Sequence, residues 1–263
     1  MRRALRSAAL LGVLGLVAVF LAACGGAEET EPAATSVAPS PTPAPAGSTA
    51  EERDAAGPIL MASALLAEDL PEGFTLDEEK YLSNEDSINE ERDYSSVATL
   101  EDLNRWGQIL QYIATYSRPA PPTLTGATLS LKEITALYRD EAGARSAFEF
   151  ERMRASSPER LLDALPWPAN SDLNAGEASV SPISVGGMGD DRAAVQIEVT
   201  GSLPDVGSEL KFFGQLLLVR RGREIGSIAT VAVGSPHPVK ELEALARTLD
   251  ERMKDALEQA PVP

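Results

Sequence analysis

The sequence has very little cysteine, histidine or positive charge. Cys24 and His237 are the only residues of their kinds among 263, and 23 Lys and Arg residues stand against 40 Asp and Glu residues, a formal net charge of -17. With one thiol the chain cannot form an internal disulfide or a zinc cluster of thiolates, so its fold must depend on a hydrophobic core. An acidic surface repels phosphate backbones, which argues against nucleic acid as a partner. We interpret the acid excess as a means of solubility.

The first residues have the layout of an export signal. MRRALR carries three positive charges, and after Ser7 an uncharged run of 17 residues extends from Ala8 to Cys24. A permanent membrane helix needs about 20 apolar residues, and no charge marks a stop beyond this run. We therefore predict that residues 1–23 are a signal peptide. A permanent span, or a twin-arginine route read from Arg2-Arg3, is the weaker alternative.

The end of the apolar run explains the single cysteine. Leu21-Ala22-Ala23-Cys24, followed by Gly25, resembles the lipobox of bacterial lipoprotein precursors. The resemblance implies that the sulfur of Cys24 receives a diacylglyceryl group and that cleavage makes Cys24 the acylated first residue. Several acyl chains, such as palmitate, on one residue give durable membrane anchoring. The alternative is that Cys24 is a small buried hydrophobe in an uncleaved helix.

Residues 24–57 are predicted to be the lipidated cysteine followed by a disordered tether. The segment has five prolines amid Ala, Ser, Thr and Glu, and almost no large apolar side chain. Such a composition cannot bury enough surface to fold. As a coil it would hold its ends on the order of 30 Å apart. Residues 58–260 have the length of one domain with its own core.

Apolar patterns in the last third of the chain predict three consecutive strands and a closing helix. Ala193–Thr200 alternates between apolar and polar residues, as a half-buried strand does. Lys211–Arg220 and Glu224–Val233 are apolar on both faces, which predicts inner strands joined by a tight turn at Gly222. After these strands, an apolar stripe from Val239 to Leu257 predicts a helix lying across a sheet.

Earlier segments predict the same mixture of elements. Gln111–Arg118 and Thr128–Tyr138 have strand patterns, and Asp140 is placed to cap a helix. N-terminal helix caps are also predicted at Ser83, Thr99 and Ser157. The expected fold is a single α+β domain with a mostly antiparallel sheet packed by helices. The order of elements, with the segment LLAEDLPEGF, resembles the Mog1/PsbP-like sandwich of some exported bacterial lipoproteins; we transfer no functional residue from it.

No motif supplies a catalytic set. His237 lies between two prolines where the last helix begins, and a helix N-terminus lowers the affinity of histidine for a proton. Its neighbour Ser235 is not oriented against it by adjacency alone. We therefore expect a loop or cap role for His237. Ser208 and Lys211 match the S-x-x-K spacing of penicillin-binding enzymes, but they lead into a strand, which sends the two side chains to opposite faces.

Ligand motifs are equally weak. Gly187-Met188-Gly189 suggests a phosphate loop, but Asp190 and Asp191 follow it and would repel anions, so we expect a turn. The acidic segment Asn84–Asp93 lacks the glycine and the ligand alternation of a calcium loop, and a solvated helix face is the better interpretation. Core or loop packing is expected for Trp106 and Trp167. We predict no cofactor and no metal.

These observations favour a non-enzymatic binding or accessory module that is anchored by lipid on the extracytoplasmic side of the cell membrane. Its expected partners are the membrane, through the lipid, and an envelope protein or a small ligand. The first alternative is a carrier that holds an apolar molecule between the last helix and the sheet; its proposed lining is Phe212, Phe213, Leu216 and Leu218. The second alternative is an envelope hydrolase that uses two buried carboxylates. The sequence identifies neither the ligand nor the oligomeric state.

Overall fold

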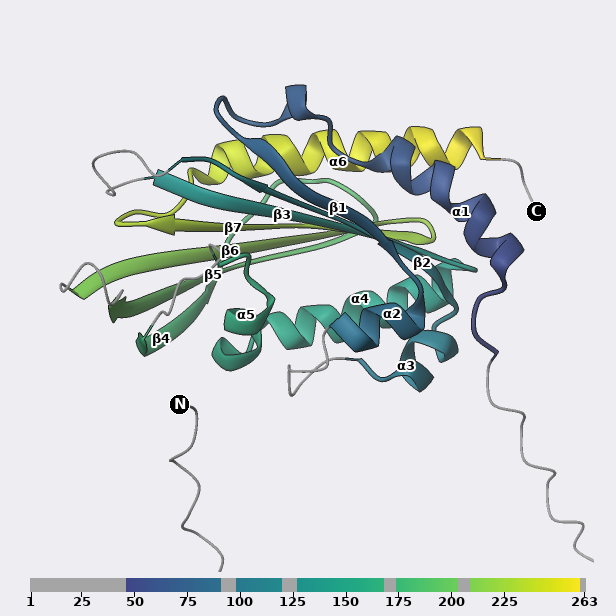
Figure 1. The fold of residues 1–263 in the computed structure, drawn as a ribbon, viewed down its shortest axis with the longest axis horizontal. Coiled ribbons are helices and arrows are strands. Elements are labelled where there is room, and N and C mark those ends of the chain that lie inside the picture. Colours follow the sequence, from purple (N-terminus) through teal and green to yellow (C-terminus); the bar gives the residue numbers. More distant parts are fainter. Residues whose placement is uncertain (1–45, 91–97, 120–126, 168–173, 203–208, 261–263) are drawn as a thin grey trace, which may run out of the picture. The chain divides into compact units, whose positions relative to one another are not determined.

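A seven-stranded sheet with helices on both faces forms a single α+β domain (Figure 1). The computed structural model of the chain describes residues 46–90, 98–119, 127–167, 174–202 and 209–260. The signal peptide, Cys24 and most of the predicted tether lie outside these ranges. Within them, no helix combines the length and the apolar character that crossing a membrane would require.

All neighbouring strands of the sheet are antiparallel, in the order β1-β2-β3-β7-β6-β5-β4. The strands are β1 (Thr75–Leu82), β2 (Gln108–Ser117), β3 (Ala127–Tyr138), β4 (Asn174–Pro182), β5 (Asp191–Ser202), β6 (Glu209–Arg221) and β7 (Glu224–Val233). The predicted β5-β6-β7 meander is confirmed. Strands β6 and β7 lie inside the sheet, where every residue of β7 is buried, as their two apolar faces predicted. Gly222 makes the turn between them with a φ of 53°.

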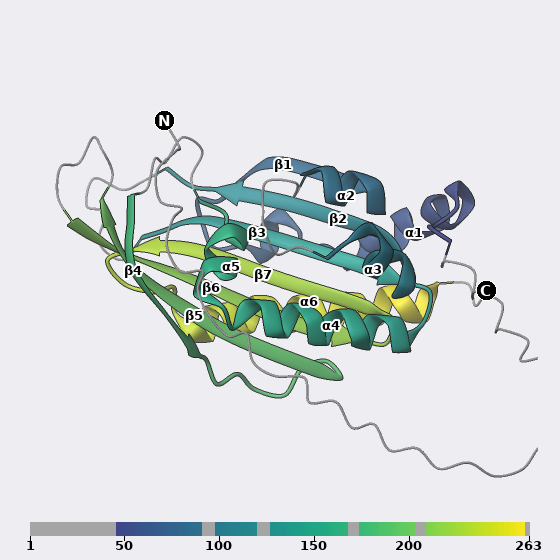
Figure 2. The ribbon, with the colours of Figure 1, turned by 90° about the horizontal axis from the view of Figure 1, so that it is seen from below.

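The helices form two layers around the sheet. They are α1 (Ala50–Ser63), the short 3-10 helix η1 (Ala67–Asp69), α2 (Asn84–Glu90), α3 (Leu100–Arg105), α4 (Glu141–Ala155), α5 (Pro158–Ala164) and α6 (Val239–Gln259). Helices α1 and α6 lie side by side on one face, and α2 to α5 cover the other (Figures 1 and 2). Each face therefore has its own hydrophobic core.

Helix α1 begins within the segment that the sequence predicted to be a disordered tether. Thr49 and Glu52 form a capping box, in which each side chain accepts the other's backbone N–H, and this stabilises the first turn. Ala56 and Leu60 are buried against the sheet, and the helix continues past Pro58. The domain boundary predicted at residue 58 thus lies inside a helix.

Most predicted caps are confirmed. The Asp140 carboxylate accepts the backbone N–H of Gly143 at 2.8 Å, and the Thr99 side chain accepts that of Asp102 at 3.1 Å. Ser83 caps α2 in the same way. Ser157 is an exception, because its side chain makes no cap hydrogen bond; Pro158 at the first helical position sets the start of α5 instead.

The stripe predicted for α6 packs closely on the sheet. Its apolar positions are buried, and they include Leu242, Leu245, Leu249 and Met253. Gly226 of β7 permits this close approach, because a Cβ atom there would lie 2.8 Å from the Leu249 side chain.

The glycine segment before β5 is held by carboxylates of α6. The Glu243 carboxylate accepts the backbone N–H of Gly186 at 2.7 Å, and the Asp250 carboxylate accepts that of Gly189 at 2.8 Å. These backbone donors therefore already have anionic partners from the protein. The segment is a turn, as predicted, rather than a phosphate loop.

Candidate functional site

One cavity lies between the sheet and the helices α2 to α5, with a volume of about 90 Å³. Its floor is mostly apolar and comes from the three central strands β3, β7 and β6. The apolar floor residues are Ile134, Ala136, Ile225, Ala229, Leu216 and Leu218, and Lys132 and Ser227 are the polar ones. We call this space the sheet cavity. It lies on the face of the sheet opposite α6. Most of its floor residues belong to the hydrophobic core beneath α4, and along each strand they alternate with residues that face α6.

The walls of the sheet cavity come from four helices. Ser87 and Ile88 belong to α2, Leu103 to α3 and Ala164 to α5. Helix α4 contributes a charged pair, in which Arg154 Nε lies 2.9 Å from the Glu151 carboxylate. A site built from helices and strands in this way is largely pre-formed.

The polar groups around the sheet cavity are paired with the protein. The Ser87 hydroxyl donates to the Gln111 side chain at 2.8 Å, and the Tyr138 hydroxyl donates to the Gln108 side chain at 3.3 Å. The described residues that have buried, unpartnered side-chain atoms all lie elsewhere. A ligand would therefore gain mainly apolar contact here, because the wall leaves few polar groups to satisfy.

The size of the sheet cavity limits what it can hold. A dry cavity of about 150 Å³ takes a molecule such as benzene. A space of about 90 Å³ therefore suits a group of a few carbon atoms, such as the end of an alkyl chain or a small branched group.

The predicted carrier site is corrected by this arrangement. Phe213 points toward the α6 face of β6, whereas Phe212, Leu216 and Leu218 belong to the core on the α4 face. Neighbouring residues of a strand point to opposite faces, so these four side chains cannot line one space. Leu216 and Leu218 do line a cavity, but on the side away from the last helix.

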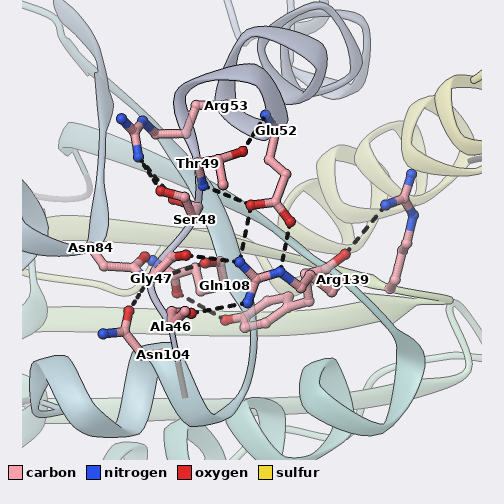
Figure 3. A network of polar contacts seen from close by, with 12 residues as sticks. Ala46, Gly47, Ser48, Thr49, Glu52, Arg53, Asn84, Asn104, Gln108 and Arg139 are labelled. Atoms are coloured by element: carbon pink, nitrogen blue, oxygen red, sulfur yellow. Dashed lines mark hydrogen bonds and ion pairs between the residues drawn. The ribbon is translucent and has the colours of Figure 1, made fainter. Parts of the chain in front are cut away.

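A second depression is broader and polar, with a volume of about 470 Å³. It lies beside the start of α4, and its lining includes Asn104, Trp106, Arg139 and Gly143. The Arg139 guanidinium is already bound by the Glu52 carboxylate and by the carbonyls of Ala46 and Gly47 (Figure 3). The guanidinium in this groove is therefore already used by contacts within the protein and is not available to a ligand.

Two carboxylates, Glu133 and Glu224, are fully buried on the face of the sheet that α1 and α6 cover, away from the sheet cavity. Burial raises the pKa of each carboxyl from 4.5 to about 8. Displaced pKa values are what the hydrolase alternative requires, but a substrate must also reach the acids. Neither residue lines the sheet cavity or the polar groove, so this pair does not form the accessible acid pair of that hypothesis.

His237 lies in the loop before α6, which is one of its two predicted roles, and it does not cap the helix. It is buried, and its Nδ1 lies 2.8 Å from the hydroxyl of Thr128 on β3. Burial lowers the pKa of the imidazole. Pro238 occupies the cap position of α6, where no side-chain cap bond forms. Ser235 is exposed, whereas the imidazole is buried beside Thr128, so these two neighbours are not brought together as a catalytic pair.

The remaining candidate residues make contacts within the fold. Lys211 lies in β6, as predicted, and pairs with Glu198 at 2.6 Å, while Ser208 lies outside the described residues. Trp167 donates to the Leu162 carbonyl at 2.8 Å and packs against Phe212. Trp106 packs against Phe150 with their ring centres 5.1 Å apart.

Part of the acidic segment Asn84–Asp93 forms a helix. Its first seven residues form α2, and residues 91–93 lie outside the described ranges. Asn84 is buried and donates to Asn104 and to the Gln108 carbonyl, at 2.8 and 3.1 Å. Among the residues that the structure describes, no group of three or more His, Cys, Asp or Glu side chains is placed to hold a metal ion.

No protein-family model matches the chain, and no curated protein does. Among solved structures, it is similar to the extracellular domain of PknH from Mycobacterium tuberculosis. The TM-score is 0.42 with 8% sequence identity, over 74% of this chain and 94% of the PknH chain. A similarity of this size does not decide a function. The Mog1/PsbP-like arrangement stays a prediction.

Proposed function

We propose that the protein is an extracytoplasmic lipoprotein, anchored through acylated Cys24, whose domain binds a small apolar ligand in the sheet cavity. The observation that carries the binding proposal is the combination of a mostly apolar floor with wall residues whose polar groups are paired internally. Such a space favours occupants that need no hydrogen bonds. The role is non-enzymatic in this proposal, and the ligand is held rather than converted.

The lipid anchor is supported by the sequence before the domain. The charged start, the short apolar run and the lipobox-like Leu21-Ala22-Ala23-Cys24 stand together, as expected for an acylated precursor. Intact-mass analysis of the protein from its native cells tests this part. We expect a chain that begins at Cys24 and carries a diacylglyceryl group, and an unmodified chain that begins at Met1 would contradict it.

Ligand binding is tested with straight-chain alcohols from butanol to dodecanol, measured by the shift in the midpoint of thermal unfolding. A ligand that binds only the folded state raises this midpoint. We expect a rise for the wild-type protein and none for Ala229→Leu, whose larger side chain fills the cavity. Ala244→Leu, on the exposed surface of α6, is the matched control and should respond like the wild type. Equal responses of all three proteins would contradict the site.

A further inference from the structure

The C-terminal end of α1 is attached to the sheet through a buried acid. Both carboxylate oxygens of Glu133, on β3, lie within 3.2 Å of the backbone nitrogen of Leu65, which follows the helix. The Tyr116 hydroxyl, from β2, donates to the Leu65 carbonyl at 3.3 Å. Glu133 is 0% exposed, and beside it on the same face of β3 the Thr135 hydroxyl is buried without a hydrogen-bond partner.

A second buried acid, Glu224 on β7, faces the same end of α1. Neither of its carboxylate oxygens has a hydrogen-bond partner among the described residues. The Ser63 hydroxyl, in the last turn of α1, is the polar group that opposes the rise of the Glu224 pKa. That hydroxyl donates to the Ile59 carbonyl at 3.0 Å, so it does not satisfy the acid. A charge on Glu224 would therefore be poorly solvated.

The charged groups around Glu133 offer it little compensation. Arg252 of α6 lowers the Glu133 pKa and Asp69 of η1 raises it. The same two residues form an ion pair at 2.8 Å, so the arginine charge is shared. Tyr116 faces Glu133 from β2, and the acid in turn raises the pKa of that phenol. These neighbours leave burial as the dominant influence, and it raises the Glu133 pKa to about 8.

Glu224 is in a similar position. Arg223, next to it in the chain, lowers its pKa, while Glu133 raises it. A charge on Glu133 therefore makes ionisation of Glu224 less favourable. Arg221, nearby on β6, is bound to Asp250 at 2.6 Å and is not among the causes of the Glu224 shift.

We propose that α1 is a proton-sensitive strap: Glu133 and Glu224 keep its C-terminal end on the sheet while they are protonated, and release it when they ionise. Ionisation would bury two negative charges on the face of the sheet beneath the end of a helix, where the carbonyl dipoles are also negative. The charges become solvated only if this end of α1 moves away. Apolar residues such as Leu60 hold the strap in place until that happens.

The N-terminal end of α1 is held by a different kind of contact. Arg139 binds the Glu52 carboxylate through two nitrogens and also donates to the carbonyls of Ala46 and Gly47 (Figure 3). The arginine holds the pKa of Glu52 down to about 2, so this end stays ionised and attached at neutral and alkaline pH. The strap is thus expected to open from its C-terminal end only.

Opening would expose the part of β2 and β3 that the last turns of α1 cover, while Arg139 keeps the chain that comes from the predicted tether attached to the sheet. The strap does not depend on the proposed lipid anchor, because its contacts lie within the domain.

Hydrogen exchange of the full chain in detergent, followed by mass spectrometry, tests the strap. Protection factors, corrected for the intrinsic pH dependence of exchange, are compared at pH 6.5 and pH 9.5. A carboxyl with a pKa near 8 in the closed state and about 4.5 when solvated should lower local protection about 30-fold over this range. We expect this loss in residues 60–66, which should exchange faster than β6 and β7 at pH 9.5 because their opening is local.

Two variants assign the effect. Glu133→Gln with Glu224→Gln keeps the shape of the neutral acids, and we expect the protection of residues 60–66 to stay constant between the two pH values. Arg139→Gln should lower protection at the start of α1 by the same factor at both pH values. Constant protection of residues 60–66 in the wild type, or exchange of these residues no faster than that of β7 at pH 9.5, would overturn the proposal. If the double variant does not fold, Glu133→Gln alone must reduce the pH effect.

Discussion

Arg139 and Glu52 join segments that are 87 positions apart in the chain, through contacts of 2.7 and 3.0 Å between two guanidinium nitrogens and the two carboxylate oxygens. The arginine follows the end of β3, and the glutamate lies in the first turn of α1. This pair fixes the place where the chain from the predicted tether enters the domain.

We expect Arg139→Ala to lower the free energy of unfolding by about 1 kcal/mol at pH 7, because a bidentate but partly exposed ion pair is lost. The lowered pKa of Glu52, about 2, means that the pair stabilises the fold above pH 4.5 and loses this effect as the pH falls toward 2. Urea unfolding should therefore separate the two proteins at pH 7 and hardly at pH 2.5. Arg145→Ala, on the exposed surface of α4, should have little effect at either pH.

Asp250 is expected to be a strong point of attachment for α6. Its carboxylate accepts from Arg221 at 2.8 and 2.6 Å and from the Gly189 N–H at 2.8 Å. Asp250→Ala should lower the free energy of unfolding by about 2–3 kcal/mol, because it leaves these donors without their acceptor. The neighbouring Glu251→Ala, on the exposed side of the same helix, is the control. Similar values for the two variants would contradict this role.

The two buried acids should make the whole domain most stable at mildly acidic pH. A carboxyl whose pKa rises from 4.5 to about 8 on folding stabilises the fold fully below pH 4.5 and loses this contribution as the pH rises through 8. We expect the midpoint of thermal unfolding to fall by at least about 5 °C between pH 6 and pH 9. Glu133→Gln with Glu224→Gln should flatten this dependence. An equal fall in the variant would assign it to other groups.

Leu216→Ala and Leu217→Ala form a matched pair for the sheet cavity. Leu216 lines the cavity, while Leu217 is buried on the α6 face of the same strand. Each change should lower the free energy of unfolding by about 2–4 kcal/mol. Only Leu216→Ala should shift the preference among straight-chain alcohols toward longer ones, because it enlarges the space. The same preference in both variants would remove the cavity as the binding site.

The sequence predicted the central strands and α6 well because their residues are apolar at the right periods. It missed β1 and β4 for physical reasons. β1 is an edge strand with the acidic run Asp77–Glu79, and most of its residues are exposed; charged edges are common because they resist unwanted pairing. β4, at the other edge, is composed of small and polar residues. Helix α1 has only Ala56, Leu60 and Ser63 buried, which gives a weak stripe.

The candidate site was less predictable than the fold. The sheet cavity needs side chains from four strands and four helices to meet, and no short stretch of sequence contains that information. One part of the buried acid pair could have been recognised. Glu133 alternates with Leu131, Thr135 and Leu137 in a strand pattern, which would have placed an acid on a buried face. The position of Glu224 on the same sheet depends on the pairing of β3 with β7, which sets Glu224 opposite Leu137 and Glu133 opposite Ile228.

Native mass spectrometry of the protein extracted gently from its native cells tests the central claim most directly. The measurement compares the mass of the intact folded protein with that of the same sample after denaturation. We expect the folded wild type to carry an additional small apolar molecule that is lost on denaturation, and Ala229→Leu to carry none. A folded wild type without extra mass, or a variant that keeps the same ligand, would contradict the account.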